Sequence, residues 1–297
     1  MRSLATIRVA ALALPLMTSL ALSAGGAEAG TATPDGPAVD AALLERGRYL
    51  VEGPAACGNC HTPQTPAGPD MARNLSGQLV EETPQFTAYA PNITPASRIA
   101  GWSDEALVRA IREGVRPDGS VMGPPMPFEL YRHLSDEDVA AIVAYLRSVP
   151  PVEAEFVASQ YRIPLPPSYG PPVTSVPPVE PGVTVEYGAY LAGPVAHCTA
   201  CHTTFGPTGP MYATHLGRGG NTFKGPWGVS VAPNITSHED GLAGHSDEEL
   251  GRMISAGVRP DGSRMVPPMG YHYYAAITDD DLAAIVLYLR SLPPLPD

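Results

Sequence analysis

Two cysteines and a histidine stand together at residues 57–61, where the sequence reads Cys-Gly-Asn-Cys-His. The arrangement returns at residues 198–202 as Cys-Thr-Ala-Cys-His, and the two motifs use all 4 cysteines of the chain. Two thiols separated by two residues can each add across a vinyl group of one haem, and the histidine that follows can be held against the iron as an axial ligand. The spacing therefore predicts two covalently attached haem c groups. The predicted residues are Cys57, Cys60, His61, Cys198, Cys201 and His202.

Other uses of paired cysteines explain this pattern less well. A thioredoxin-like Cys-x-x-Cys motif does not need the histidine that follows here. A zinc site needs two close cysteine pairs or a pair with neighbouring histidines, whereas these pairs lie 141 residues apart. Two disulfide bridges remain open as an alternative, although they give no role to the histidines.

The chain contains an internal repeat around these motifs. Gly47-Arg-Tyr-Leu returns as Gly188-Ala-Tyr-Leu at an offset of 141 residues, and Met122-Gly-Pro-Pro-Met returns as Met265-Val-Pro-Pro-Met at an offset of 143. Offsets that drift by so little indicate one fold, duplicated in tandem. The predicted organisation is a signal peptide at 1–29, a first domain at 38–152, a proline-rich linker or strap at 153–180 and a second domain at 181–297.

Each copy is expected to be all-α, because its apolar residues recur at helical spacing and no stretch has a clear strand pattern. A first helix is predicted at about 38–52, and its counterpart at 183–193. Serine and threonine N-caps followed by acidic residues predict the starts of two further helices in each copy. The N-caps are Ser103 and Ser135 in the first copy and Ser246, with Glu249 in a capping box, and Thr278 in the second.

Glycines in the first helices suggest how each domain is packed. Gly47 and Gly188 lack a side chain, so each first helix is expected to cross close to the last helix of its copy. The crossing points are expected near Tyr145 and Tyr288.

A second axial ligand would close each iron to substrates. Met126 and Met269 each follow a Pro-Pro pair ahead of the last helix, and a thioether ligand raises the reduction potential of a haem. We predict both as iron ligands, with Met122 and Met265 as alternatives and His272 as a competitor at the second haem. Asn92, Asn234, Arg116 and Arg259 are further candidates for contacts near a ligand or a haem propionate.

The N-terminus and the charge balance bear on location and partners. Arg2 and Arg8 precede an apolar run, and Ala27-Glu-Ala29 offers small residues at a cleavage site, so residues 1–29 are predicted to direct export to the periplasm. No other apolar stretch could span a bilayer, so membrane association would need a partner or an uncleaved signal. The net charge of −12 disfavours nucleic acid and favours a basic docking surface on a redox partner, although solubility alone would also explain it.

Several motifs resemble those of the cytochrome c subunits of membrane-bound alcohol and gluconate dehydrogenases. They include Asn92-Ile-Thr, Gly101-Trp-Ser-Asp-Glu and Pro125-Met-Pro-Phe, and the resemblance spans about 40–151 and 181–294. It implies two tandem class I-like cytochrome c domains, and it favours Met126 because the methionine before Pro-Phe or Pro-Tyr is the axial ligand in that family. The second copy departs from the pattern: Gly270-Tyr follows Met269, and His245 stands where the first copy has a tryptophan. The chain has two haem motifs, where those subunits tend to have three.

The expected function is that of an electron carrier rather than an enzyme. An exported dihaem cytochrome c would move single electrons from a periplasmic or membrane-bound dehydrogenase to a respiratory acceptor, such as a cytochrome or an oxidase. Two alternatives stay open: a dihaem redox enzyme of the peroxidase or thiosulfate-oxidising type, and a cytochrome subunit within a dehydrogenase complex.

Overall fold

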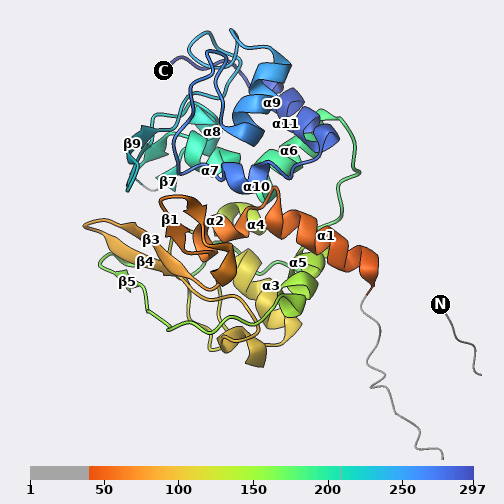
Figure 1. The fold of residues 1–297 in the computed structure, drawn as a ribbon, viewed down its shortest axis with the longest axis vertical. Coiled ribbons are helices and arrows are strands. Elements are labelled where there is room, and N and C mark those ends of the chain that lie inside the picture. The colour runs from red at the N-terminus through yellow and green to blue at the C-terminus, as the bar shows by residue number, and fades with distance from the viewer. Residues whose placement is uncertain (1–39, 208) are drawn as a thin grey trace, which may run out of the picture. The chain divides into compact units, whose positions relative to one another are not determined.

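The computed structural model describes residues 40–207 and 209–297, so the predicted signal peptide at 1–29 lies outside the described residues. The helices of the first half are α1 (Ala41–Glu52), α2 (Cys57–His61), η1 (Met71–Arg73), η2 (Arg98–Gly101), α3 (Asp104–Glu113), α4 (Phe128–Tyr131) and α5 (Asp136–Ser148). Those of the second half are α6 (Val185–Tyr190), which continues into the π-helical turn η3 (Leu191–Val195), then α7 (Cys198–His202), α8 (Tyr212–His215), α9 (Asp247–Ala256), α10 (Tyr271–Tyr274) and α11 (Asp279–Ser291). The same order of main helices recurs in the two halves (Figure 1).

Small antiparallel hairpins accompany the helices, so the expectation of an all-α fold is wrong in this respect. β3 (Gln78–Glu82) pairs with β4 (Phe86–Ala90), and β8 (Thr222–Gly225) pairs with β9 (Gly228–Val231). Two-residue strands form two further hairpins: β1 (Gln64–Thr65) with β2 (Gly68–Pro69), and β6 (Phe205–Gly206) with β7 (Gly209–Pro210). These strands span two to five residues, which is too short for a clear alternating pattern in the sequence. Tight turns connect the paired strands, such as Gly225–Gly228, where Gly228 has a positive φ.

The predicted N-caps are confirmed. The side chains of Ser135 and Thr278 accept hydrogen bonds from backbone N–H groups three residues on, at 3.1 and 3.3 Å, and open α5 and α11. Ser103 opens α3 in the same way, and Ser246 with Glu249 forms the predicted capping box at α9.

The close helix crossings are confirmed as well. A β-carbon at Gly47 would collide with the backbone carbonyl of Ala141 and with Tyr145, so α1 and α5 touch backbone to backbone. The equivalent contact in the second half joins Gly188 of α6 to Ala284 of α11, beside Tyr288. Only glycine permits this approach in either half.

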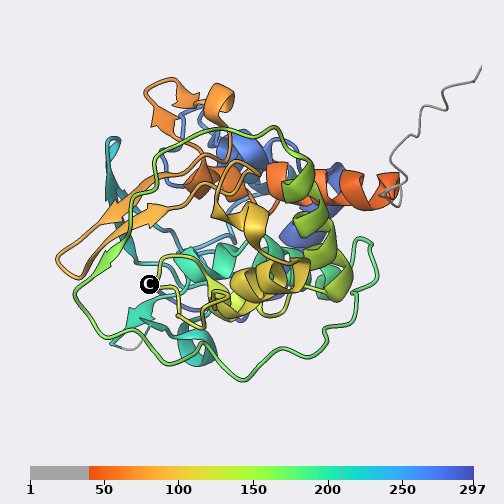
Figure 2. The same ribbon diagram turned by 90° about the horizontal axis from the view of Figure 1, so that it is seen from below.

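The segment 153–180 lies against the first half as an extended strap, shown in green in Figure 2. Its strand β5 (Gln160–Tyr161) adds to β4 and makes a three-stranded sheet. Further along, Ser175 Oγ donates to Asp136 at 2.7 Å, and the Val173 N–H donates to Glu113 at 3.0 Å. This segment therefore makes specific contacts along its length and is more than a spacer.

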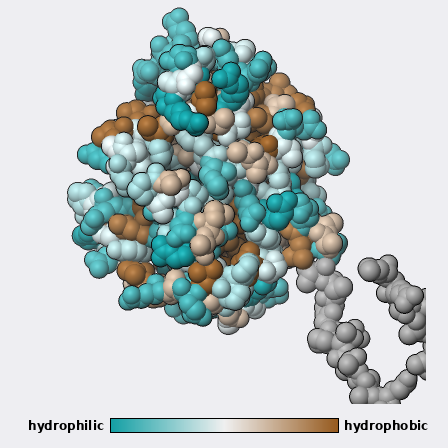
Figure 3. Space-filling view, in the orientation of Figure 1, coloured by the Kyte–Doolittle hydropathy of each residue, from teal (hydrophilic) through white to brown (hydrophobic). Residues whose placement is uncertain are grey.

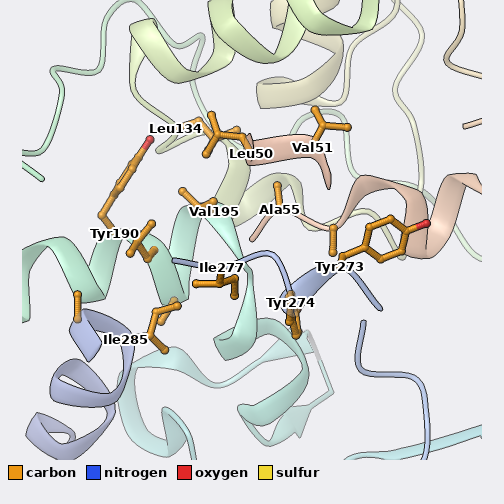
Figure 4. Close-up of a cluster of buried hydrophobic side chains, with 14 of the residues drawn as sticks. Leu50, Val51, Ala55, Leu134, Tyr190, Val195, Tyr273, Tyr274, Ile277 and Ile285 are labelled. Carbon is orange, nitrogen blue, oxygen red and sulfur yellow. The ribbon is translucent and has the colours of Figure 1, made fainter. Parts of the chain in front are cut away.

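One hydrophobic cluster unites the two halves. Leu50, Val51 and Leu134 of the first half join Val195 and Ile277 of the second in a single buried group, part of which Figure 4 shows. Burial of such large apolar side chains is the main term that favours the folded chain.

Within the residues that the structure describes, no helix is long and apolar enough to cross a membrane.

We expect Gly47→Ala and Gly188→Ala each to lower the free energy of unfolding by about 2 kcal/mol, because the new methyl group must force the crossing helices apart. Denaturant unfolding of the haem-loaded protein measures the change. Gly101→Ala and Gly244→Ala are matched controls, since a β-carbon at either position would meet nothing within 4 Å. Equal losses in all four variants would contradict the crossing as the cause.

Candidate haem-binding sites

The two cysteine pairs lie on single helical turns. α2 and α7 each begin after a residue in the left-handed conformation, Ala56 at φ 46° and His197 at φ 44°. Residues three apart share one face of a helical turn, so the two thiols of each motif point to the same side. All four cysteines are free thiols, so the structure does not contain the disulfide bridges considered above.

The electrostatics of the thiols argue against redox-active cysteines. Burial raises the pKa of Cys57 and Cys198 to about 12, and that of Cys60 and Cys201 to about 11. A reactive Cys-x-x-Cys motif needs the opposite shift, because the thiolate is the nucleophile. Among residues 40–207 and 209–297, no group of three or more His, Cys, Asp and Glu side chains could hold a metal ion. The two free thiols of each helical turn are spaced to form thioethers with one haem.

The two motif histidines are held in the same way. His61 Nδ1 lies 2.8 Å from the carbonyl oxygen of Pro91, and His202 Nδ1 lies 2.8 Å from that of Pro233. A carbonyl can only accept, so Nδ1 must carry the proton in both rings and Nε2 keeps a free lone pair. Burial lowers the pKa of both imidazoles and favours the neutral form. This is the state that an iron ligand requires, with the ring orientation fixed by its hydrogen bond.

The four polar side chains suggested near a propionate or a ligand make hydrogen bonds within the fold. Asn92 Nδ2 donates to the carbonyl of Val152 at 2.6 Å, and Asn234 Nδ2 donates to that of Leu295 at 2.7 Å. Each amide thereby ties its Asn-Ile-Thr turn to the chain beyond the last helix. Arg116 and Arg259 bond to the serines at the ends of their own turns, at 3.1 and 3.2 Å. These four side chains therefore have local structural roles, and their suggested contacts with a propionate or an iron ligand stay predictions.

The two methionines of each proline-rich loop lie in different surroundings. Met126 and Met269 pack against the main hydrophobic cluster, as Cys57 and Cys198 also do. The backbones of Met122 and Met265 are instead bonded to the helix-ending glycines Gly114 and Gly257, at 2.7 and 2.8 Å.

Two reciprocal hydrogen bonds join the halves beside these sites. Tyr49 of α1 donates to Asp281 of α11 at 2.5 Å, and Tyr190 of α6 donates to Asp138 of α5 at 2.6 Å. The carboxylates are 9% and 6% exposed. The two pairs occupy equivalent positions of the repeat, so each half gives the other the same contact.

Sequence reasoning treated these aspartates as parts of acidic helix starts and missed their role between the halves. The signal available in the sequence was that one tyrosine and one aspartate each recur at equivalent positions of the repeat. It also missed Arg147 and Arg290, which bond to Asp104 at 3.1 Å and to Asp247 at 2.9 Å.

The same two arginines account for one departure within the repeat. Arg147 donates to the backbone carbonyl of Trp102, and Arg290 donates to that of His245. Because each arginine bonds to a backbone carbonyl, the contact can form whether that position has the side chain of tryptophan or of histidine.

Histidines outside the motifs take two kinds of position. His197 packs its ring edge-on against Tyr131 of the first half, with ring centres 5.8 Å apart, and burial lowers its pKa to about 4. It therefore belongs to the contact between the halves. His272, the competing ligand, is exposed on α10 next to Tyr273, which is buried.

We expect Tyr49→Phe and Tyr190→Phe each to lower the free energy of unfolding by about 2 kcal/mol, as for other hydrogen bonds to buried charged groups. Denaturant unfolding of the haem-loaded protein provides the measurement. Tyr288→Phe is the control, because burial and charge raise the pKa of its hydroxyl and no hydrogen bond contributes within the described part of the chain. Losses no larger than the control's would show that the pairs do not hold the halves together.

Comparison with known proteins agrees with this geometry. The family model for cytochrome c matches residues 44–150 and again 185–293. The chain is 33% identical over 90% of its length to one of the subunits of a nicotinate dehydrogenase of Pseudomonas putida, and 31% identical over 87% of its length to the cytochrome c subunit of the quinone alcohol dehydrogenase of Gluconobacter oxydans. It spans 23% of the first protein and 56% of the second. It is also 28% identical over 80% of its length to a dihaem c-type cytochrome of Cereibacter sphaeroides, of which it spans 82%.

The match therefore falls once on each half, and each matched region contains one Cys-x-x-Cys pair on a single helical turn. The unpaired thiols are available for covalent attachment. The chain belongs to the cytochrome c family, with two cytochrome c domains in tandem, and it is an electron carrier with two covalently attached haem c groups.

Proposed function

We propose that this chain is the cytochrome subunit of a dehydrogenase complex and carries single electrons from the dehydrogenase to a respiratory acceptor. Haem supplies the one-electron chemistry when it is bound. The observation that carries the proposal is the pair of motif histidines, each with Nδ1 bonded to a carbonyl 2.8 Å away, which leaves the Nε2 lone pair for a bond to iron.

The chain's own side chains favour electron transfer over catalysis at the haems. His61 and His202 each offer one neutral nitrogen, and Met126 and Met269 offer a thioether from a proline-rich loop. With a histidine and a methionine as ligands, a bound haem iron would have no position left for a substrate and would have a raised reduction potential. His272 is exposed, which supports Met269 as the second ligand in that half.

The relatives support the assignment to a complex. Their names describe one subunit of a nicotinate dehydrogenase and the cytochrome c subunit of a quinone alcohol dehydrogenase. Both names include a dehydrogenase, so this chain would receive electrons from such an enzyme rather than act on its substrate. The predicted signal at 1–29 supports a periplasmic location for the complex, with membrane association through a partner.

The surface suits brief encounters with an acceptor. The face shown in Figure 3 has hydrophobic residues dispersed among polar ones, without one broad apolar area. The net charge of −12 would steer the chain toward a basic surface on its partner. Redox encounters are commonly small and transient, which fits such a surface.

A potentiometric titration followed by optical spectra tests the proposal. We expect two low-spin haems per chain, both in the potential range of histidine–methionine ligation, and no change of spectrum on addition of peroxide. Co-purification of the tagged chain with a dehydrogenase subunit is the expected result for the complex. A haem that stays high-spin, or that binds peroxide rapidly, would favour the dihaem peroxidase alternative.

Methionine variants test the sixth ligands separately. We expect Met126→Ala and Met269→Ala each to convert about half of the total haem, which is one haem of two, to a form that binds cyanide rapidly. Met122→Ala and Met265→Ala are the controls, because these residues occupy the same loops through backbone contacts. The assignment fails if the controls change the spectrum and the first pair does not.

A further inference from the structure

The two methionine loops have nearly the same sequence but are held by different neighbours. In the first half, Tyr161 Oη donates to the carbonyl of Pro124 at 2.7 Å, and Tyr169 Oη donates to that of Met122 at 2.9 Å. Both tyrosines belong to the strap at 153–180. The ring of Tyr169 also packs on Phe128, with centres 4.8 Å apart. The loop of Met126 is thus fixed by the strap of its own half.

The second loop is seated on the haem attachment turn of the first half. Asn59, between Cys57 and Cys60 in α2, donates from Nδ2 to the carbonyl of Pro268 at 2.9 Å. Pro268 is the residue directly before Met269. This hydrogen bond therefore connects the attachment segment of one haem to the backbone that presents the methionine of the other.

Close packing surrounds this hydrogen bond. A β-carbon at Gly270 would lie 3.3 Å from Ala56 Cβ and 3.4 Å from Asn59 Cγ. The hydroxyl of Tyr273 lies against Gly58, in the same motif, where it is buried and has no hydrogen-bond partner among the described residues. The loop and helix α10 of the second half therefore rest directly on α2.

The second attachment turn lacks the residues that would make the same contact with the first methionine loop. The position equivalent to Asn59 is Ala200, which has no side-chain donor, and the position equivalent to Tyr273 is Leu130. The hydrogen bond from attachment turn to methionine loop thus runs in one direction only, from the first motif to the second loop.

We propose that Asn59 is a positioning residue for Met269, so that the ligation of the second haem depends on the attachment turn of the first. This rests on the proposed function, in which Met269 is the sixth ligand. An uncharged thioether is a weak ligand, so its occupancy depends on how firmly the backbone presents it. Loss of the hydrogen bond would free the Pro268 carbonyl and let the loop leave the iron more often.

Imidazole binding to the ferric, fully haem-loaded protein tests the proposal, because an added ligand must wait for the methionine to leave. The two haems are distinguished by the shifted NMR signals of the two methionine methyl groups, assigned with Met126→Ala and Met269→Ala. We expect Asn59→Ala to raise the binding rate at the Met269 haem by about tenfold, as for loss of one hydrogen bond, and to leave the Met126 haem unchanged.

The controls remove neighbouring hydrogen bonds. Gln78→Ala deletes a side chain that donates to the carbonyl of the same Asn59 at 3.0 Å without touching the second loop, and should leave both rates unchanged. Tyr161→Phe should accelerate binding at the Met126 haem alone. If Asn59→Ala fails to mature, Asn59→Asp keeps the shape and removes the donor.

The outcomes distinguish the positioning role of Asn59 from the role of Met269 as an iron ligand. Unchanged binding at the Met269 haem in the Asn59 variants, or acceleration at the Met126 haem instead, overturns the positioning role and leaves the proposed function standing. If unmodified protein lacks a shifted Met269 methyl signal, Met269 is not the ligand, and both the positioning role and this part of the proposed function fail.

Discussion

The direct backbone contact between the first and last helices of each half is the constraint on which both haem sites depend. At Gly47 and Gly188 no side chain separates the helices, so the crossing holds each first helix close to the last helix of its half. The attachment turns follow within a few residues, through left-handed residues at Ala56 and His197. A wider crossing would displace each attachment turn from the proline carbonyl that orients its histidine.

Duplication has kept this arrangement while the surroundings of the two sites have diverged. The histidine–carbonyl bonds, the arginine anchors at Arg147 and Arg290 and the reciprocal Tyr–Asp pairs are all present twice. The supports of the methionine loops are not, because the strap covers one loop and Asn59 bonds to the other. Two haem sites with the same kinds of ligand residue can therefore hold their methionine ligands with unequal firmness.

Much of this could be predicted from sequence because its signals are local. The cysteine spacing, the N-caps and the repeat each depend on residues close together in the chain. The contacts between the halves could not, since Tyr49 and Asp281 lie 232 positions apart and their side chains carry no local mark. Asp138 illustrates the limit: its N–H completes the cap with Ser135, as predicted, while its carboxylate accepts from Tyr190 and Arg46. The hairpins were missed because strands of two to five residues give little periodicity.

The reciprocity of the Tyr–Asp pairs has an evolutionary consequence. A contact in which each partner gives the other the same surface is what a twofold homodimer has. An ancestral chain with one haem could associate with its own copy through one tyrosine and one aspartate, before fusion made the pair permanent. The strap at 153–180 then corresponds to the joint that fusion introduced, and duplication of the gene is what allowed positions 59 and 200 to become different residues.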